Sequence, residues 1–219
     1  MEPIRICIAD DHKLFRKLTI AYLRSVDRID YRVLEAENGK ELLRKMRSHP
    51  VDVVLLDISM PLMGGEEAAA ILIKRYPRIK IVMLTIDDSP AKVLELMNLG
   101  VHGYLLKDCE PEEVVKAVKA VVDRDFYKNE VAERALNHAE IVSGKKNGAE
   151  RLLGELTKRE KEILQHICDE CTTKEIGARL CISEKTVENH RINMLQKLSA
   201  KNTVGLVKYA YENGLVPPN

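Results

Sequence analysis

The chain has 219 residues, of which 45% are hydrophobic and 32% are charged, a balance typical of a folded globular protein. This composition excludes the disordered, collagen-like and coiled-coil classes, and the length predicts two small domains, each large enough to bury its own core. Because the formal net charge is only +1, any preference for nucleic acid or for an anionic membrane must be local.

The sequence carries no pattern for membrane insertion or export. The longest unbroken hydrophobic run, Ala68 to Ile73, is far shorter than a membrane span. The first residues also lack the basic, apolar and small-residue pattern of a secretion signal. We therefore expect a cytoplasmic protein that does not contact a membrane.

The five cysteines predict reduced thiols in preference to a disulfide framework, since their number is odd and the expected compartment is reducing. Cys168 and Cys171 have a spacing that a zinc site could use, with His166 nearby, but they lack the expected second pair of cysteines. Cys168 also falls on the apolar stripe of a predicted helix, so we expect a core residue there.

From residue 4 to residue 123, short runs rich in Ile and Val alternate with longer segments of helical period. The predicted strands are Ile4–Ala9, Tyr31–Glu35, Asp52–Leu56, Lys80–Thr85 and His102–Leu106. The predicted helices lie near residues 12–26, 39–48, 65–76, 89–99 and 111–123. Strands that are apolar on both sides of the pleat suit a parallel sheet covered on both faces. The pattern therefore predicts a doubly wound α/β domain.

Residues 124–150 differ from what precedes them. Asn129 is a candidate N-cap for a helix that includes Leu136, and the polar, glycine-bearing stretch 143–148 predicts a flexible linker. After residue 151 only helical patterns remain, and we expect a compact all-helical domain. Its helix starts are marked by capping boxes at Thr157 and Thr172, with Ser183 capping a third helix. A fourth helix is predicted over Thr203–Asn213.

The residues that end the predicted strands suggest a chemical site. In open α/β sheets, ligands bind beyond the carboxyl ends of the strands, and here those ends carry Asp10, Asp11, Asp57, Thr85 and Lys107. Taken singly, each is explained as a cap, a turn residue or a solvated charge. Three carboxylates held together repel one another, however, so their convergence predicts a hard divalent cation, with Mg²⁺ the natural candidate.

With such a cation present, Asp57 could attack a phosphoryl group as a nucleophile. Lys107 and the Thr85 hydroxyl would then balance charge on the phosphoryl oxygens. The sequence contains no Walker glycine-rich loop, so nothing in it indicates a nucleotide as the phosphate donor.

These residues stand in motifs that resemble the receiver domain of two-component response regulators, and the match covers the first 123 residues. The motifs are Ala9–His12, Leu55–Pro61 followed by Gly64, Met83–Thr85 and Gly103–Lys107. The resemblance implies a flavodoxin-like, five-stranded parallel sheet in the order 2-1-3-4-5. It also implies that the domain is phosphorylated by a sensor histidine kinase.

By this resemblance, Asp57 accepts phosphate from the phosphohistidine of the kinase. Asp11 and Asp57 ligate Mg²⁺ together with the backbone carbonyl of Ser59, and Asp10 takes part through water. A departure from the family pattern is Ile86, which stands where a small residue is usual and could crowd access to the site.

The resemblance further implies a switch formed by Thr85 and Tyr104, in which the hydroxyl turns toward the phosphoryl group and the aromatic side chain follows it inward. A core aromatic at a strand end explains Tyr104 as readily.

The segment Thr172–Leu198 predicts a short helix, Lys174–Leu180, a three-residue turn and a longer helix, Glu184–Leu198. This is helix-turn-helix spacing. We expect the longer helix to bury a stripe that includes Val187 and Met194. Its outward face would carry Lys185, Glu188, Asn189, Ile192 and Gln196. Five basic residues and only two carboxylates lie within 179–201, which indicates local positive charge, although a solvated amphipathic helix would show the same pattern.

This part resembles the LuxR-type DNA-binding domain through Leu156–Glu160, Lys174–Gly177, Ile182–His190 and Lys197–Leu198. Joined to a receiver domain, it is similar to the NarL/FixJ group of response regulators. The resemblance implies that the longer helix enters the major groove of double-stranded DNA. The residues placed against DNA would be Lys185, Glu188, Asn189 and Ile192, with Asn189 suited to adenine.

The last helix resembles the surface through which family members form a homodimer on DNA, with Val204, Val207 and Tyr211 on one stripe; core packing is the competing explanation. Two departures precede the short helix, because Glu170 and Thr173 replace the usual Gly and Asn. They predict a strained or reshaped turn within a retained fold.

The sequence thus predicts a receiver domain over 1–123, a helix and linker over 124–150 and a helix-turn-helix domain over 151–219. The expected function is a phosphorylation-controlled transcription regulator and not an enzyme. Two alternatives stay open. One is a Mg²⁺-dependent phosphohydrolase in which the aspartyl phosphate turns over, and the other is a DNA-binding regulator that does not depend on phosphate.

Overall fold

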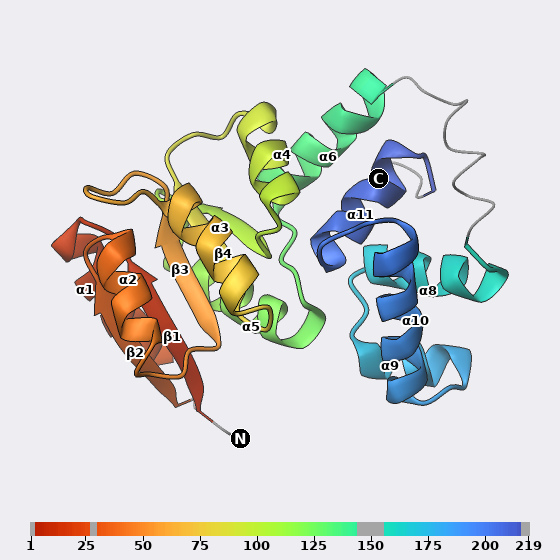
Figure 1. Ribbon diagram of the computed structural model, residues 1–219, viewed down its shortest axis with the longest axis horizontal. Helices are drawn as coiled ribbons and strands as arrows, with labels where there is room; N and C mark the ends of the chain where they lie inside the picture. Colours follow the sequence, from red (N-terminus) through yellow and green to blue (C-terminus); the bar gives the residue numbers. More distant parts are fainter. Residues whose placement is uncertain (1–2, 27–29, 144–155, 216–219) are drawn as a thin grey trace. The chain divides into compact units, whose positions relative to one another are not determined.

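A computed structural model of the chain describes residues 3–26, 30–143 and 156–215, with side chains omitted for 138–143 (Figure 1). By their contacts the residues form two compact units, one of 1–88 and 101–122, the other of 89–100 and 123–219. Of the predicted linker over 143–148, Ser143 is the last residue of a helix, and residues 144–148 lie outside the described residues. None of the helices in the described ranges is long and apolar enough to cross a membrane.

The first unit contains a five-stranded parallel sheet in the order β2-β1-β3-β4-β5, which confirms the predicted topology. Its strands are β1 (Ile4–Ala9), β2 (Tyr31–Ala36), β3 (Val53–Asp57), β4 (Lys80–Thr85) and β5 (Gly103–Leu106). Each strand lies within one residue of its predicted bounds. The apolar run of β3 is wholly buried, which accounts for its lack of polar alternation. The strands align so that their carboxyl ends lie along one edge of the sheet.

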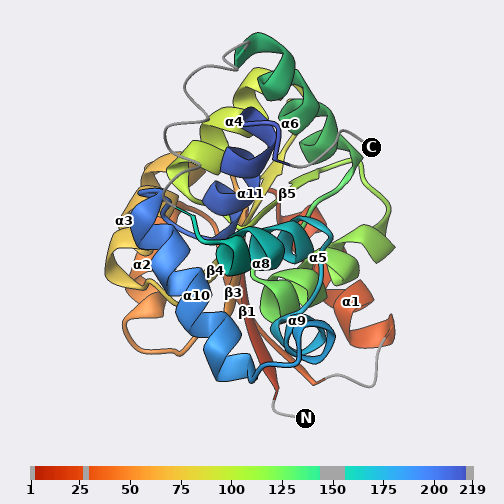
Figure 2. The same ribbon diagram turned by 90° about the vertical axis from the view of Figure 1, so that its right-hand side faces the viewer.

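Helices cover both faces of this sheet. Helices α1 and α5 lie on one face, and α2 and α3 lie on the other (Figure 2). Their bounds are α1 (Lys13–Val26), α2 (Gly39–Met46), α3 (Gly65–Arg75) and α5 (Pro111–Arg124). Gly65 is required by a close approach, because a Cβ atom there would lie 2.1 Å from the carbonyl oxygen of Asp57. The first turn of α3 is thereby held against the end of β3.

The second unit is helical. Its helices are α4 (Pro90–Leu99), α6 (Glu130–Ser143), α8 (Lys158–Cys168), α9 (Thr173–Leu180), α10 (Glu184–Lys197) and α11 (Thr203–Glu212). The capping boxes at Thr157 and Thr172 are both formed, and the Ser183 side chain caps α10 as predicted. Helix α4 packs against α6 and α11 (Figures 1 and 2).

The core of the second unit contains the residues that sequence alone left open. Val204, Val207 and Tyr211 are all at most 3% exposed, so in this structure they belong to the core. Cys168 is also 3% exposed, and burial raises the pKa of its thiol to about 12, which suits a core residue. Glu170 adopts a left-handed conformation with φ 59°, the strained turn that the departures from the family pattern predicted.

Candidate functional site

Three carboxylates meet at the carboxyl edge of the sheet. Asp10, directly after β1, is fully buried, and Asp57, the last residue of β3, is 2% exposed. Asp11 lies exposed beside them. A carboxylate oxygen from each of these residues and a ring nitrogen of His12 all lie within 4.8 Å of one another. The structure therefore brings together the three predicted carboxylates.

Lys107 supplies the positive charge that contacts this cluster. Its Nζ lies 2.9 Å from Oδ2 of Asp10 and 2.9 Å from Oδ2 of Asp57. One ammonium group against three carboxylates leaves an excess of negative charge. Two of the three carboxylates, those of Asp10 and Asp57, are buried. The donors are carboxylate oxygens, which is the set that Mg²⁺ prefers, so the residues present fit the predicted cation.

The buried position of this cluster changes how its members titrate. Burial raises the pKa of Asp57 above its usual value, although the hydrogen bond and charge of Lys107 oppose this rise. Burial also lowers the pKa of Lys107, but hydrogen bonds to Asp57 and Asp10 outweigh it, and the pKa of the ammonium is raised. Lys107 is therefore held in its charged form as the partner of both carboxylates.

An open cavity of about 490 Å³ has Asp57 in its lining. Thr85 and Lys107 line it together with Ser59. The Thr85 hydroxyl accepts a hydrogen bond of 2.9 Å from the backbone N–H of Asp87, so in this structure it is engaged with the following loop. Ile86 lines the cavity and is 88% exposed, and its predicted crowding of access stays a prediction.

The remaining predicted site residues, Ser59 and Tyr104, lie outside the cluster of carboxylates. The backbone N–H of Ser59 lies 3.3 Å from Oδ1 of Asp57, which keeps this residue beside the cluster. Tyr104 is buried on β5 at 3% exposed and does not line the cavity. His12 is a possible ligand that sequence reasoning missed, although its place directly after Asp10 and Asp11 was a signal for it.

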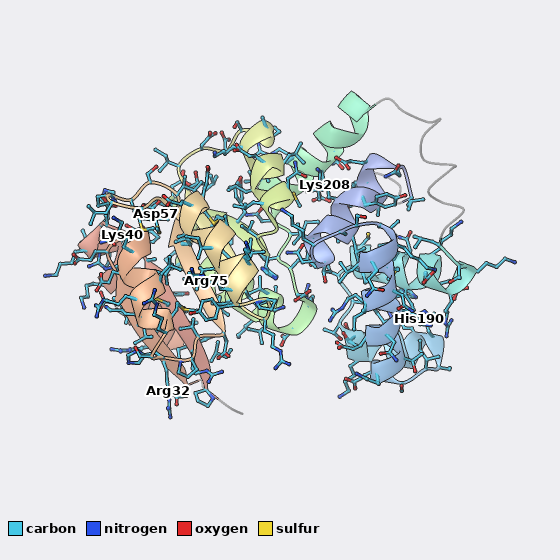
Figure 3. The ribbon with its side chains drawn as sticks, viewed as in Figure 1. Arg32, Lys40, Asp57, Arg75, His190 and Lys208 are labelled. Atoms are coloured by element: carbon cyan, nitrogen blue, oxygen red, sulfur yellow. The ribbon has the colours of Figure 1, made fainter. Side chains whose placement is uncertain are left out.

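A second candidate site is the outward face of α10. Val187 and Met194 are buried on its inner side as predicted. Lys185 and Asn189 are exposed, and Ile192 is 48% exposed. These residues form a solvent-facing surface on one helix, the geometry that groove reading requires. His190, labelled in Figure 3, is only partly exposed on the same helix.

Glu188 is also on this helix, and its carboxylate forms an ion pair with Arg191. Its Oε1 lies 3.0 Å from a guanidinium nitrogen of Arg191, and their side chains are 43% and 22% exposed. The pair neutralises charge within the predicted reading face.

Comparison with known proteins identifies two regions of the chain. A family model described as the response regulator receiver domain matches residues 6–119, and one described as bacterial regulatory proteins, luxR family, matches residues 154–210. The chain is a two-component response regulator of the NarL/FixJ group. It is a DNA-binding transcription regulator.

Relatives of this response regulator match along nearly its whole length. The transcriptional regulatory protein DegU of Brevibacillus brevis is 35% identical, over 97% of this chain and 95% of that protein. The oxygen regulatory protein NreC of Staphylococcus carnosus is 32% identical, over 97% and 99%. The solved structure of RcsB of Salmonella typhimurium is similar in fold, with a TM-score of 0.57 and 23% identity over 95% of this chain and 98% of that one. RcsB has also been solved in complex with DNA and as two dimers on two parallel DNAs.

The basic residues near α10 of the response regulator are less available than the sequence suggested. Lys197 lies 2.8 Å from Glu160, a buried residue that also completes the Thr157 capping box. Lys201 donates to the carbonyl oxygen of Asn98, 3.0 Å away at the end of α4. The expected concentration of positive charge is therefore reduced by ion pairs and hydrogen bonds within the second unit.

Proposed function

We propose that Asp57 is the phosphoacceptor of this response regulator and that a sensor histidine kinase is its donor. A carboxylate oxygen of Asp57 attacks phosphorus, the bond between phosphorus and the imidazole nitrogen breaks, and its electron pair returns to the ring. The observation that carries the proposal is the convergence of Asp10, Asp57 and Lys107 at an open cavity.

We assign the cation site to Asp10, Asp11 and Asp57, with the backbone carbonyl of Ser59. A bound Mg²⁺ would offset charge on the phosphoryl oxygens. Lys107 is placed to contact the same oxygens, because it already lies 2.9 Å from the attacking carboxylate. The Thr85 hydroxyl would exchange its hydrogen bond from Asp87 for one to the phosphoryl group, with Tyr104 following as the second part of the switch.

Apolar side chains at the edge of this cavity, here named the apolar rim, support a protein donor. Leu14 and Ile86 line the cavity and are 72% and 88% exposed, and Leu18, one turn after Leu14 on α1, is 61% exposed. Large exposed hydrophobic side chains beside a polar site are typical of a protein-binding surface. We therefore propose that the kinase docks over this rim in the cytoplasm.

On the second unit, we propose that α10 enters the major groove and that the protein binds DNA as a homodimer. Asn189 would pair with adenine, Ile192 would contact a thymine methyl group and Lys185 would contact phosphate. Glu188 would accept from cytosine only if it released Arg191. Because the stripe of Val204, Val207 and Tyr211 is buried in the core, the homodimer would have to use other residues.

Contacts of α4 support control of the second unit by phosphate. This helix follows Thr85 by only a few residues in the chain, and its C-terminal end accepts hydrogen bonds from residues at the start of α11. The Asn202 side chain donates to the carbonyl oxygen of Gly100, and Lys208 donates to the side chain of Asn98. A change at Thr85 that moved α4 would therefore disturb α11.

The proposal is tested by treating the full-length protein and an Asp57→Asn variant with acetyl phosphate and Mg²⁺. We expect one phosphate per wild-type chain by intact mass spectrometry, tighter binding to a selected DNA site, and neither effect in the variant. Asp88→Asn, an exposed control on the same edge, should behave as wild type.

Three results would argue against the proposal. Label retained in Asp57→Asn would place the phosphoacceptor elsewhere. Steady phosphate release over many turnovers would favour a phosphohydrolase, and unchanged DNA affinity after stoichiometric labelling would favour a regulator that does not depend on phosphate.

A further inference from the structure

A second cavity lies at the opposite edge of the same sheet from Asp57, where the strands begin. Its volume is about 870 Å³, and it is lined at the starts of β1, β3 and β4 and at the C-terminal ends of α2 and α3. In Figure 3, Arg75 marks the end of α3 and Asp57 lies near its start. The phosphoacceptor site and this cavity therefore share no lining residues.

Basic side chains dominate this cavity. The basic lining residues are Arg5, Arg47, His49, Arg75, Arg78 and Lys80. Asp52 is the only carboxylate among the lining residues, and it is held by Arg5 through contacts of 2.9 and 2.5 Å. Within the part of the chain that the structure describes, no hydrogen bond or ion pair engages the guanidinium groups of Arg47, Arg75 and Arg78.

Helix C-termini explain part of this charge but not all of it. Cations near a helix C-terminus offset a partial charge of roughly −0.5, and α2, α3 and α5 all end close to the cavity. Together with Asp52, these ends supply roughly −2.5 against five Lys and Arg side chains. Positive charge remains in excess within a concave site, which is the electrostatic condition for binding an anion.

We propose that this cavity, here named the basal pocket, binds a ligand that carries two or more phosphate groups. Three arginines without a partner on the described protein can each offer a pair of parallel N–H donors to phosphate oxygens. The volume lies within the range of small-molecule sites and suits a nucleotide or a short inorganic polyphosphate. Tyr76, a half-buried aromatic residue of the lining, offers a ring face that would favour a nucleotide.

The basal pocket is tested by isothermal titration calorimetry on the full chain with ATP, tripolyphosphate and adenosine at about 0.15 M salt. We expect ATP and tripolyphosphate to bind and adenosine not to bind. The double variant Arg75→Gln, Arg78→Gln should bind ATP and tripolyphosphate more weakly, by about tenfold or more, since each lost hydrogen bond is charge-assisted. Both arginines are exposed, so the fold should be retained.

Two further variants make the result specific. Arg32→Gln removes a basic residue that is 70% exposed on the same unit and outside the pocket, and it should leave affinity unchanged. If ATP binds more tightly than tripolyphosphate, and Tyr76→Leu abolishes the difference, the ligand is a nucleotide. Equal affinities that Tyr76→Leu leaves unchanged identify an inorganic polyphosphate.

The proposal is overturned if neither phosphate compound binds, or if Arg32→Gln weakens binding as much as the double variant. It is also overturned if duplex DNA displaces ATP from wild type and the double variant loses affinity for DNA but keeps its affinity for ATP. The basic residues would then bind nucleic acid. Labelling of Asp57 should be the same in all these variants, which separates this test from that of the phosphoacceptor.

Discussion

At the scale of single residues, one buried and one half-buried titratable group show how environment assigns a role. His102 is 5% exposed and its Nδ1 accepts a hydrogen bond of 3.2 Å from the backbone N–H of Ile81. Burial, with a further contribution from the charge of Lys80, lowers the pKa of His102 to about 3. Lys107 shows the opposite case, because its charge is retained by the two carboxylates it contacts. One residue is kept neutral and the other is kept charged.

The neutral state of His102 predicts a loss of stability at acid pH. The imidazole ionises near pH 6.5 in the unfolded chain and near 3 in the folded one, so below pH 6.5 the unfolded state binds the extra proton. Above pH 6.5 His102 is neutral in both states and does not destabilise the fold. From there toward pH 4, the free energy of unfolding should fall by about 1 kcal/mol for each pH unit. Urea unfolding of wild type and His102→Asn at several pH values measures this. The free energy of unfolding should fall less steeply with falling pH in the variant, and equal pH dependence in the two proteins would contradict the assignment.

Removing the Lys107 ammonium group from the acidic cluster should destabilise the first unit. Lys107→Met leaves Asp10 and Asp57 buried without their partner, and we expect the free energy of unfolding to drop by about 3 kcal/mol in chelator. Mg²⁺ should restore more stability to this variant than to wild type, because the variant cluster is more negative. Denaturant melts of both proteins in EDTA and in Mg²⁺ measure this. Lys40→Met, on the exposed face of α2, should show neither effect.

At the scale of elements, the helix-turn-helix depends on capping and on close backbone approach. The Thr172 and Ser183 side chains accept from N–H groups at the starts of α9 and α10, and Gly177 lets the two helices meet. A Cβ atom on Gly177 would lie 2.8 Å from the carbonyl oxygen of Ile182. Backbone atoms on both sides of this contact leave little room for relaxation.

Gly177→Ala should therefore cost about 1 to 3 kcal/mol of stability and tilt α10 relative to α9. Thermal unfolding and DNA binding measured by fluorescence anisotropy should both decline. Gly205→Ala is the matched control, because its Cβ atom would lie 3.2 Å from the Cβ atom of Ala200, and the nearest backbone atom is at an ordinary contact distance of 3.6 Å. Equal losses in the two variants would show that the close approach at Gly177 is unimportant.

At the scale of the whole molecule, the second unit joins segments that are distant in sequence. Glu170, in the turn before α9, lies 2.7 Å from Arg124 and 3.8 Å from Lys128. Asp125 accepts from the Thr203 hydroxyl at the start of α11. The end of α5 and the residues that follow it thus contact the turn before α9 and the start of α11. These contacts hold the turn before α9 and the start of α11 against the end of α5.

We expect that breaking the tie at Glu170 increases DNA binding in the absence of phosphate. Arg124→Gln removes the ion pair and keeps the backbone, and affinity should rise by about two- to fivefold, since the pair is partly exposed. Glu170→Gly also relieves left-handed strain and should combine the same rise with little loss of stability. Anisotropy titrations without phosphodonor measure both, and unchanged affinity in both variants would show that the tie does not restrain binding.

Much of the fold could be read from local pattern. Strands buried on both faces must be continuously apolar, so β1, β3 and β4 were bounded closely, and hydroxyl-to-carboxylate spacing located the starts of α8 and α9. The carboxylates of the candidate site were also predictable, because parallel strands deliver their ends to a single edge. Asp10, Asp57 and Lys107 meet there as expected.

Local pattern established the two structural classes and the residues at the carboxyl edge of the sheet, and family resemblance supplied the strand order. The partners of the charged side chains became known from the packed fold alone. Lys197 turned out to hold Glu160, and the arginines of the basal pocket came together from separate helices and strands. The physical reason is range: backbone periodicity and capping act over a few residues, whereas ion pairs and cavities join residues whose separation along the chain carries no local signal.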